Sequence, residues 1–258
     1  MRLMKRILSA AAVLALSASL LVGCSSGTAS SVPVSASSAA ESTVSSVEET
    51  ASSAVDENEA AAAQLLNDLT GSYQELWPVI LADEYKQTWL DDCTALVGED
   101  NAEAAFEKLS SMVTGDVYGE DAVKAYANGG GAYFCGFTNS LAILTFDGET
   151  STISGTDKDG NALFSHTYHY IGMEPVRGLY EFQSDDADSG EFTYFFLAPD
   201  TSAETYHIEF RYGSDAEALS QYDTGEYAYW LASGISTDCD QTMIDNGIEL
   251  FCTENLAG

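Results

Sequence analysis

Two side chains of types that bind divalent metals lie in the C-terminal third of the chain, with one residue between them. His207 and Glu209 belong to Tyr206–Phe210 (YHIEF), whose composition predicts a strand. Side chains two apart on a strand point to the same face, about 7 Å apart along the chain. Imidazole nitrogen and carboxylate oxygen are both zinc ligands. The alternative is a solvent-facing polar pair without a ligand, which is the more common outcome for this spacing, and both interpretations stay open.

The other two histidines lie on one further predicted strand. His166 and His169 belong to Asn161–Ile171, and their odd separation places them on opposite faces of that strand. At most one of them can therefore join His207, unless the strand is bulged. The candidate metal ligands are His207 and Glu209, completed by His166 or His169.

Other polar motifs predict turns rather than chemistry. Asp157–Asn161 (DKDGN) opens like a calcium loop, but the twelfth position is Tyr168, where that loop needs a bidentate Glu, so a hairpin turn is predicted. Asp185–Asp188 (DDAD) predicts a solvated acidic loop, with a weak calcium site as the rarer alternative. There is no Gly-x-Ser-x-Gly motif, and the three histidines match no hydrolase pattern. We therefore predict no enzymatic activity.

The N-terminus predicts export and lipid anchoring. Three basic residues among the first six precede the apolar stretch Ile7–Val22, which is short for a membrane span. Leu21–Cys24 (LVGC) then resembles the bacterial lipobox, in which the cysteine thiol is acylated and the preceding peptide bond is cut. The alternative is an ordinary secretory signal with an incidental cysteine. We expect the protein at the cell membrane, anchored through the lipid on Cys24 and facing outside the cytoplasm.

Composition divides the chain into three parts. Residues 1–23 are the lipoprotein signal peptide, residues 24–62 a Ser/Ala-rich tether without aromatic residues, and residues 63–258 the folded domain. The tether has too little apolar surface to offset its ordering entropy, so it is expected to be disordered. The net charge of −32 argues against nucleic acid or an anionic membrane surface as a partner.

Hydrophobic periodicity changes along the folded domain. From residue 67 to about residue 127 it is helical, with Leu69, Tyr73, Leu76 and Trp77 at helical spacing and a second amphipathic run over Ala102–Val113. Short strands separated by Gly and Asp turns follow, and residues 219–230 and 241–251 look mixed or helical. The fold class is α+β, mainly β, with N-terminal helices before an antiparallel barrel or sandwich. The predicted strands are Leu141–Phe146, Ser151–Ser154, Asn161–Ile171, Gly178–Gln183, Glu191–Leu197 and Tyr206–Tyr212.

Four cysteines besides Cys24 remain in the folded domain. They are Cys93, Cys135, Cys239 and Cys252. An even number in an exported protein predicts one or two disulfides, with three possible full connectivities. In a reducing envelope they would instead be buried small hydrophobes.

Several segments together resemble a known family. Val176–Phe182 (VRGLYEF), Phe192–Pro199 (FTYFFLAP) and His207–Gly213 (HIEFRYG) are similar to the ZinT/YodA family, and Gly71–Val79 (GSYQELWPV) is similar to that family's first-helix signature. The family consists of zinc- and cadmium-binding periplasmic or lipoprotein domains. The resemblance implies a lipocalin-like barrel, zinc or another divalent cation as the ligand, and a metal importer as a candidate partner.

The ligand set departs from the family pattern. The family holds its metal with one His in an Asp-His segment and two in His-x-His. Alignment on Ala198 and Pro199 puts Phe195 at the first position, and alignment on Gly213 puts His207 and Glu209 at the other two. Either His166 or His169 replaces the lost ligand, or the domain keeps the barrel and no longer binds zinc tightly. The predicted function is therefore an extracytoplasmic, lipid-anchored protein that captures or buffers a divalent metal. The alternative is a metal-free, lipocalin-like module that binds a ligand or a protein through an aromatic cavity around Phe195.

Overall fold

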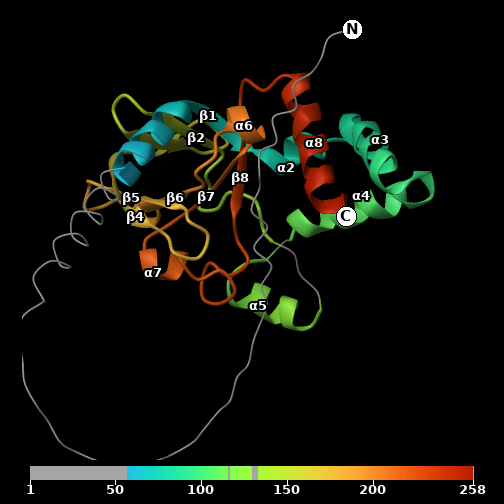
Figure 1. Ribbon diagram of the computed structural model, residues 1–258. Coiled ribbons are helices and arrows are strands. Elements are labelled where there is room, and N and C mark those ends of the chain that lie inside the picture. The colour runs from blue at the N-terminus through green and yellow to red at the C-terminus, as the bar shows by residue number, and fades with distance from the viewer. Residues whose placement is uncertain (1–56, 116, 130–132, 258) are drawn as a thin grey trace, which may run out of the picture. The chain divides into compact units, whose positions relative to one another are not determined.

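Eight antiparallel strands form a closed barrel in the computed structural model, which describes residues 57–115, 117–129 and 133–257. Each strand pairs with the next in sequence, and β1 pairs with β8 to close the ring (Figure 1). The α+β, mainly β class and the antiparallel barrel predicted above are confirmed. The signal peptide, Cys24 and most of the tether lie outside the described residues. The strands are β1 (Gly71–Glu75), β2 (Ile143–Asp147), β3 (Thr152–Thr156), β4 (Ala162–Met173), β5 (Tyr180–Ser184), β6 (Tyr194–Leu197), β7 (Ile208–Gly213) and β8 (Ala232–Ser236).

Aromatic side chains fill the inside of the barrel. Along β7, Ile208, Phe210 and Tyr212 alternate with outward-facing residues and are almost completely buried. Phe195 on β6 pairs across the sheet with Phe182 on one side and Tyr212 on the other. Because such pairs stack side chains on one face, they form a continuous apolar interior.

Helices build a second core beside the barrel. α3, α4 and α8 gather together on one side of it (Figure 1), and α2 lies between them and the strands. Buried residues of α3 and α8 recur every four positions, so each helix presents one apolar face to the other. Among the described residues, no helix has the length and apolar character needed to cross a membrane. The helices are residues 57–68, α2 (Leu76–Ile80), α3 (Lys86–Val97), α4 (Glu99–Val113), α5 (Glu120–Ala127), α6 (Ser202–Thr205), α7 (Ala216–Leu219) and α8 (Gln241–Leu256).

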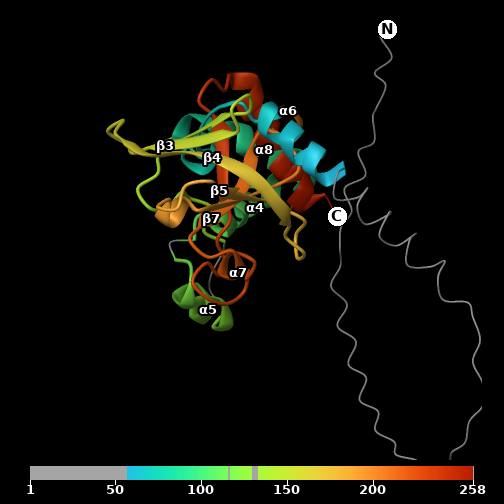
Figure 2. The same cartoon turned by 90° about the vertical axis from the view of Figure 1, so that its left-hand side faces the viewer.

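The helix over residues 57–68 belongs to the barrel core (cyan in Figure 2). Ala62, Leu65 and Leu66 are buried against the barrel residues. The β2–β3 turn passes close to the C-terminal end of this helix. A Cβ on Gly148 in that turn would collide with the backbone of Asn67. Glycine is therefore required at that turn, and the contact fixes the hairpin against the helix.

The secondary-structure prediction is wrong at one strand and misses another. Gly71–Glu75 was expected to be helical but forms strand β1, because the buried residues Leu69, Tyr73 and Leu76 belong in turn to a turn, a strand and a short helix, and only together imitate helical spacing. β8 (Ala232–Ser236) was not predicted, since its sequence ASGIS has one β-branched residue and no alternation. The six predicted strands are confirmed with shifts of a few residues at their ends. Of the two segments expected to be mixed or helical, residues 241–251 lie within α8, whereas residues 219–230 are mostly turns and bends.

Candidate functional site

His207 and Glu209 lie together on the outer face of the barrel. His207 directly precedes β7, and Glu209 is the second residue of that strand. Ile208 and Phe210 point into the barrel, so the two polar side chains point outward, toward α2 and α8. Nε2 of His207 is 3.9 Å from Oε1 of Glu209. This confirms the prediction that the two side chains share one face.

The imidazole of His207 is held in one orientation. Its Nδ1 lies 2.7 Å from the carbonyl oxygen of Thr205, and the Thr205 hydroxyl donates to the carbonyl of His207 at 2.7 Å. Tyr206, between them, has φ of 65°, which turns the chain back on itself. A carbonyl only accepts hydrogen bonds, so Nδ1 carries the proton in the neutral ring. The lone pair of Nε2 is therefore left facing Glu209, the usual arrangement of a metal-binding histidine.

The charge of the His207 imidazole depends on its neighbours. Burial lowers the pKa of the ring, but the Glu209 carboxylate, the Thr205 carbonyl and Asp200 raise it by more. The pKa of His207 is therefore above its ordinary value. A proton competes with a metal ion for Nε2, and the neighbouring carboxylate favours either cation.

A small cavity opens beside this pair. It has a volume of about 80 Å³ and is enclosed by side chains of α2, β7 and α8. Trp77 and Phe251 form apolar sides, and Glu254 of α8 lines the same cavity as His207 and Glu209. Glu254 was not singled out from the sequence, because nothing in its spacing relates α8 to β7.

His166 and His169 lie elsewhere. Both are on β4, and each is paired with a carboxylate of the β5–β6 loop: Nδ1 of His166 is 2.7 Å from Asp186, and Nδ1 of His169 is 2.6 Å from Asp185. The side chain of His166 is 16% exposed and that of His169 is 53% exposed, which confirms that they point to opposite faces. The acidic loop thus holds two histidines, a pairing that the sequence did not indicate.

The strand register separates these histidines from His207. Met173 at the end of β4 aligns through Tyr180 and Leu197 with Phe210 of β7. His166 lies near the start of β4, seven residues to one side of this row, whereas His207 lies three residues to its other side. The structure brings together two of the four predicted ligands, His207 and Glu209. Within residues 57–115, 117–129 and 133–257, no group of three or more His, Cys, Asp or Glu side chains is arranged to hold a metal ion.

The chain is similar, at low sequence identity, to solved zinc-bound structures of a protein with a ZinT-like domain. The Zn(II)-bound ZinT-like domain of Streptococcus pneumoniae AdcA superposes with a TM-score of 0.46 at 15% identity, covering 72% of this chain and 89% of that one. Zn(II)-bound AdcA of the same organism superposes with a TM-score of 0.44 at 14% identity over 72% of this chain, which spans 35% of AdcA. No protein-family model matches the chain, and no curated protein does.

The position that the ZinT/YodA alignment gives to the first histidine lies inside the barrel. Phe195 is completely buried, and its ring is 5.4 Å from the rings of Tyr168 and Tyr212, centroid to centroid. It therefore faces away from His207 and Glu209, which are on the outer side. In the described part of the barrel, aromatic side chains of β4 and β7 pack around Phe195.

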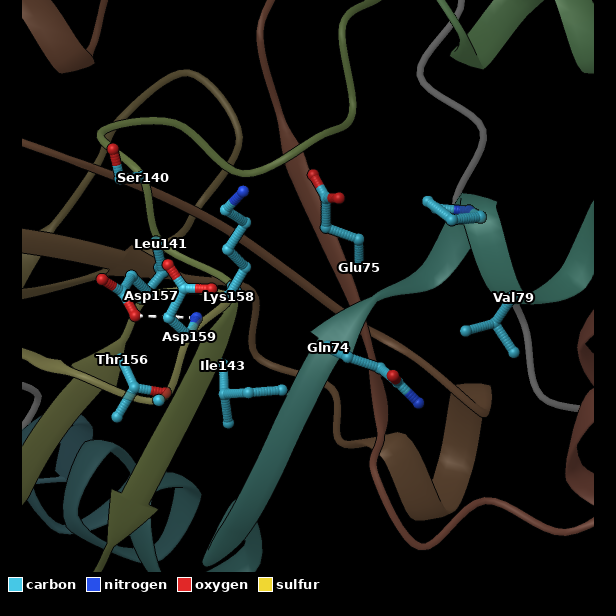
Figure 3. Close-up of a pocket in the computed structure, with 13 residues that line it drawn as sticks. Gln74, Glu75, Val79, Ser140, Leu141, Ile143, Thr156, Asp157, Lys158 and Asp159 are labelled. Atoms are coloured by element: carbon cyan, nitrogen blue, oxygen red, sulfur yellow. Dashed lines mark hydrogen bonds between the residues drawn. The ribbon is translucent and has the colours of Figure 1, made fainter.

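A larger groove opens near the start of α2 (Figure 3). Its volume is about 740 Å³, and it runs from Gln74 and Glu75 to the β3–β4 loop. The Glu75 carboxylate accepts a hydrogen bond from the Phe137 amide at 2.6 Å, and Asp157 accepts from the Asp159 and Asn161 amides. Hydrogen bonds to Asn161 lower the pKa of Asp157. These carboxylates are used within the fold, and Asp157–Asn161 is the hairpin turn predicted from the sequence.

Proposed function

We propose that the protein binds a divalent metal ion, with zinc the best fit, at His207 and Glu209. The observation that carries this proposal is the free Nε2 of His207, 3.9 Å from the Glu209 carboxylate and fixed by the Thr205 carbonyl. Two donors bound to one zinc ion at about 2 Å each are about 3.3 Å apart. A small movement of the Glu209 side chain, which is 43% exposed, closes the difference.

We further propose that Glu254 becomes the third ligand by rotation of its side chain, since within the described residues it does not yet form a metal-holding group with His207 and Glu209. It lines the same cavity and comes from α8, on the side facing β7. Two protein ligands alone bind zinc weakly, and structural or transport sites commonly use three or four. A His–Glu–Glu set has one nitrogen and two oxygen donors, which suits zinc and other first-row divalent metals. Water would take the remaining position.

Calorimetry with zinc chloride on the full chain tests this site. We expect His207→Ala to weaken zinc binding at least about tenfold, because it removes the one nitrogen donor, and Glu254→Gln to weaken it less. Binding should also weaken as the pH falls, beginning above pH 6.5, since the raised pKa of His207 lets protons compete earlier. The matched control is the double variant His166→Ala/His169→Ala, which should bind zinc like wild type.

Three results would separate the possibilities. Wild type without a site tighter than about 0.1 mM, or His207→Ala binding as well as wild type, would refute the metal site. Loss of binding in the His166/His169 double variant would instead mean that β4 supplies ligands, as the sequence alone allowed.

We also propose that the protein is anchored outside the cytoplasm by lipid on Cys24, where it captures or buffers the metal for an importer. The basic N-terminus, the apolar stretch and LVGC support this location. Cys24→Ser should be unlipidated and should move from the membrane to the soluble fraction after cell lysis. Immunoblotting of fractions and mass spectrometry of the mature N-terminus measure this. A Cys24→Ser protein that still carries lipid would overturn the anchor.

A further inference from the structure

Two buried cysteines meet where α3 and α8 pack. Cys93 and Cys252 are both fully buried, and their sulfur atoms are 3.9 Å apart. They are far apart in sequence, so this proximity comes from the tertiary fold. All four cysteines of the described residues are free thiols in the structure.

The helix sequences hold the two thiols in place. Trp89 and Cys93 lie one turn apart on the buried face of α3. Ile248 and Cys252 do the same on α8, and all four residues belong to the helical core. Close-packed neighbours fix the backbones, so the thiols can approach mainly by rotation of their side chains. The sulfur atoms need to move about 2 Å closer to reach bonding distance.

We propose that Cys93 and Cys252 form a disulfide that clamps α8 against α3. The proposal rests on the extracytoplasmic location proposed above, where a disulfide oxidant is available. One cysteine thiolate attacks the oxidant disulfide and releases one thiol. The second cysteine then attacks the mixed disulfide and releases the other thiol. Two protein thiols thus lose two protons and two electrons, and one oxidant disulfide becomes two thiols.

Burial determines when this bond forms. Burial raises the pKa of Cys93 and of Cys252, and the neighbouring sulfur raises that of Cys252 further. Thiolate is the reactive form, so the folded, reduced protein should react slowly. We expect the bond to form while the chain folds, and then to resist reduction.

The bond has a consequence for the metal site. The face of α8 next to Cys252 carries Gly247, Phe251 and Glu254, which line the cavity of His207. Fixing α8 on α3 therefore fixes one side of that cavity. The disulfide is a structural element of the proposed site, although its formation does not require bound metal.

Refolding in glutathione buffers tests the proposal. The full chain is unfolded, reduced and refolded with either oxidised or reduced glutathione, then alkylated, digested and analysed by mass spectrometry without reduction. We expect a linked Cys93–Cys252 peptide only after oxidative refolding. Oxidised wild type should melt at a higher temperature than reduced wild type, because the cross-link constrains the unfolded chain.

Variants give the control. Cys93→Ser and Cys252→Ser should each abolish the linked peptide and the difference in melting temperature between oxidised and reduced protein. Cys239→Ser, at a partly exposed position, should preserve both. Fully alkylated Cys93 and Cys252 in oxidatively refolded wild type, or a link from either one to Cys135 or Cys239, would overturn the pairing. Peptide mapping is carried out without added metal. Its result is therefore independent of the zinc titration that tests the metal site.

Discussion

Replacing Arg211 with Met is expected to lower the free energy of unfolding by about 3–5 kcal/mol. Arg211 is an outward-facing residue of β7, yet it is fully buried, because the chain after β7 folds back over it. Its guanidinium donates to the carbonyls of Leu219, Gln221 and Tyr227. The charge also lies 4.3 Å from the centre of the Tyr222 ring.

The size of this effect follows from what Arg211 leaves behind. A buried ion pair can often be replaced by apolar residues, because both partners change. Here the partners are backbone carbonyls, which remain and lose their hydrogen bonds when Arg211 becomes Met. Urea unfolding followed by circular dichroism measures the loss. Arg211→Lys keeps the charge and some donors, so it should cost less than Arg211→Met. An Arg211→Met variant within about 1 kcal/mol of wild type would show that the covering segment is not held by this side chain.

Replacing Phe195 with Ala is expected to cost about 3–5 kcal/mol in the free energy of unfolding. The ring is fully buried in the barrel, and Phe164, Tyr168, Phe210 and Tyr212 surround it. These neighbours come from two strands of a closed sheet, β4 and β7, so they cannot collapse far into the space that the ring leaves.

Urea unfolding again gives the measurement, with Val176→Ala as the control. Val176 is 65% exposed, so its truncation should change the free energy of unfolding by less than about 0.5 kcal/mol. A cost below about 1 kcal/mol at Phe195 would mean that the barrel interior has spare room. That result would favour the metal-free, ligand-binding alternative over a filled core.

The sequence predicted best those features that depend on local periodicity. Strands β2 to β5 and β7 have alternating residues, β6 is a short apolar run, and all six were found. The shared face of His207 and Glu209 follows from their spacing alone. The prediction was wrong at β1 because Tyr73 lies in a short strand between two helices, so the buried residues around it imitate helical spacing. β8 was not predicted because ASGIS is stabilised by pairing with β1 and β7 rather than by its own strand propensity.

The parts of the site that could not be predicted depend on tertiary structure. Glu254 reaches the cavity of His207 only because α8 packs beside α2 and β7. The Thr205 carbonyl orients the imidazole through a backbone turn at Tyr206, where a non-glycine residue adopts positive φ. His166 and His169 were placed correctly on opposite faces, but their carboxylate partners come from a loop whose position is set by β5 and β6.

The pairing of β1 with β8 has a consequence for the order of folding. Tyr73 lies opposite Ser236, so the two strands that close the ring come from the two ends of the barrel sequence. A ribosome releases the β1 segment long before it has made β8. Until then the sheet has an open edge on each side, which can pair with other chains. Pairing at such long sequence separation is also slow. The barrel can therefore close only after almost the whole chain has emerged, so the first strands must wait with unpaired edges for most of the time that synthesis takes.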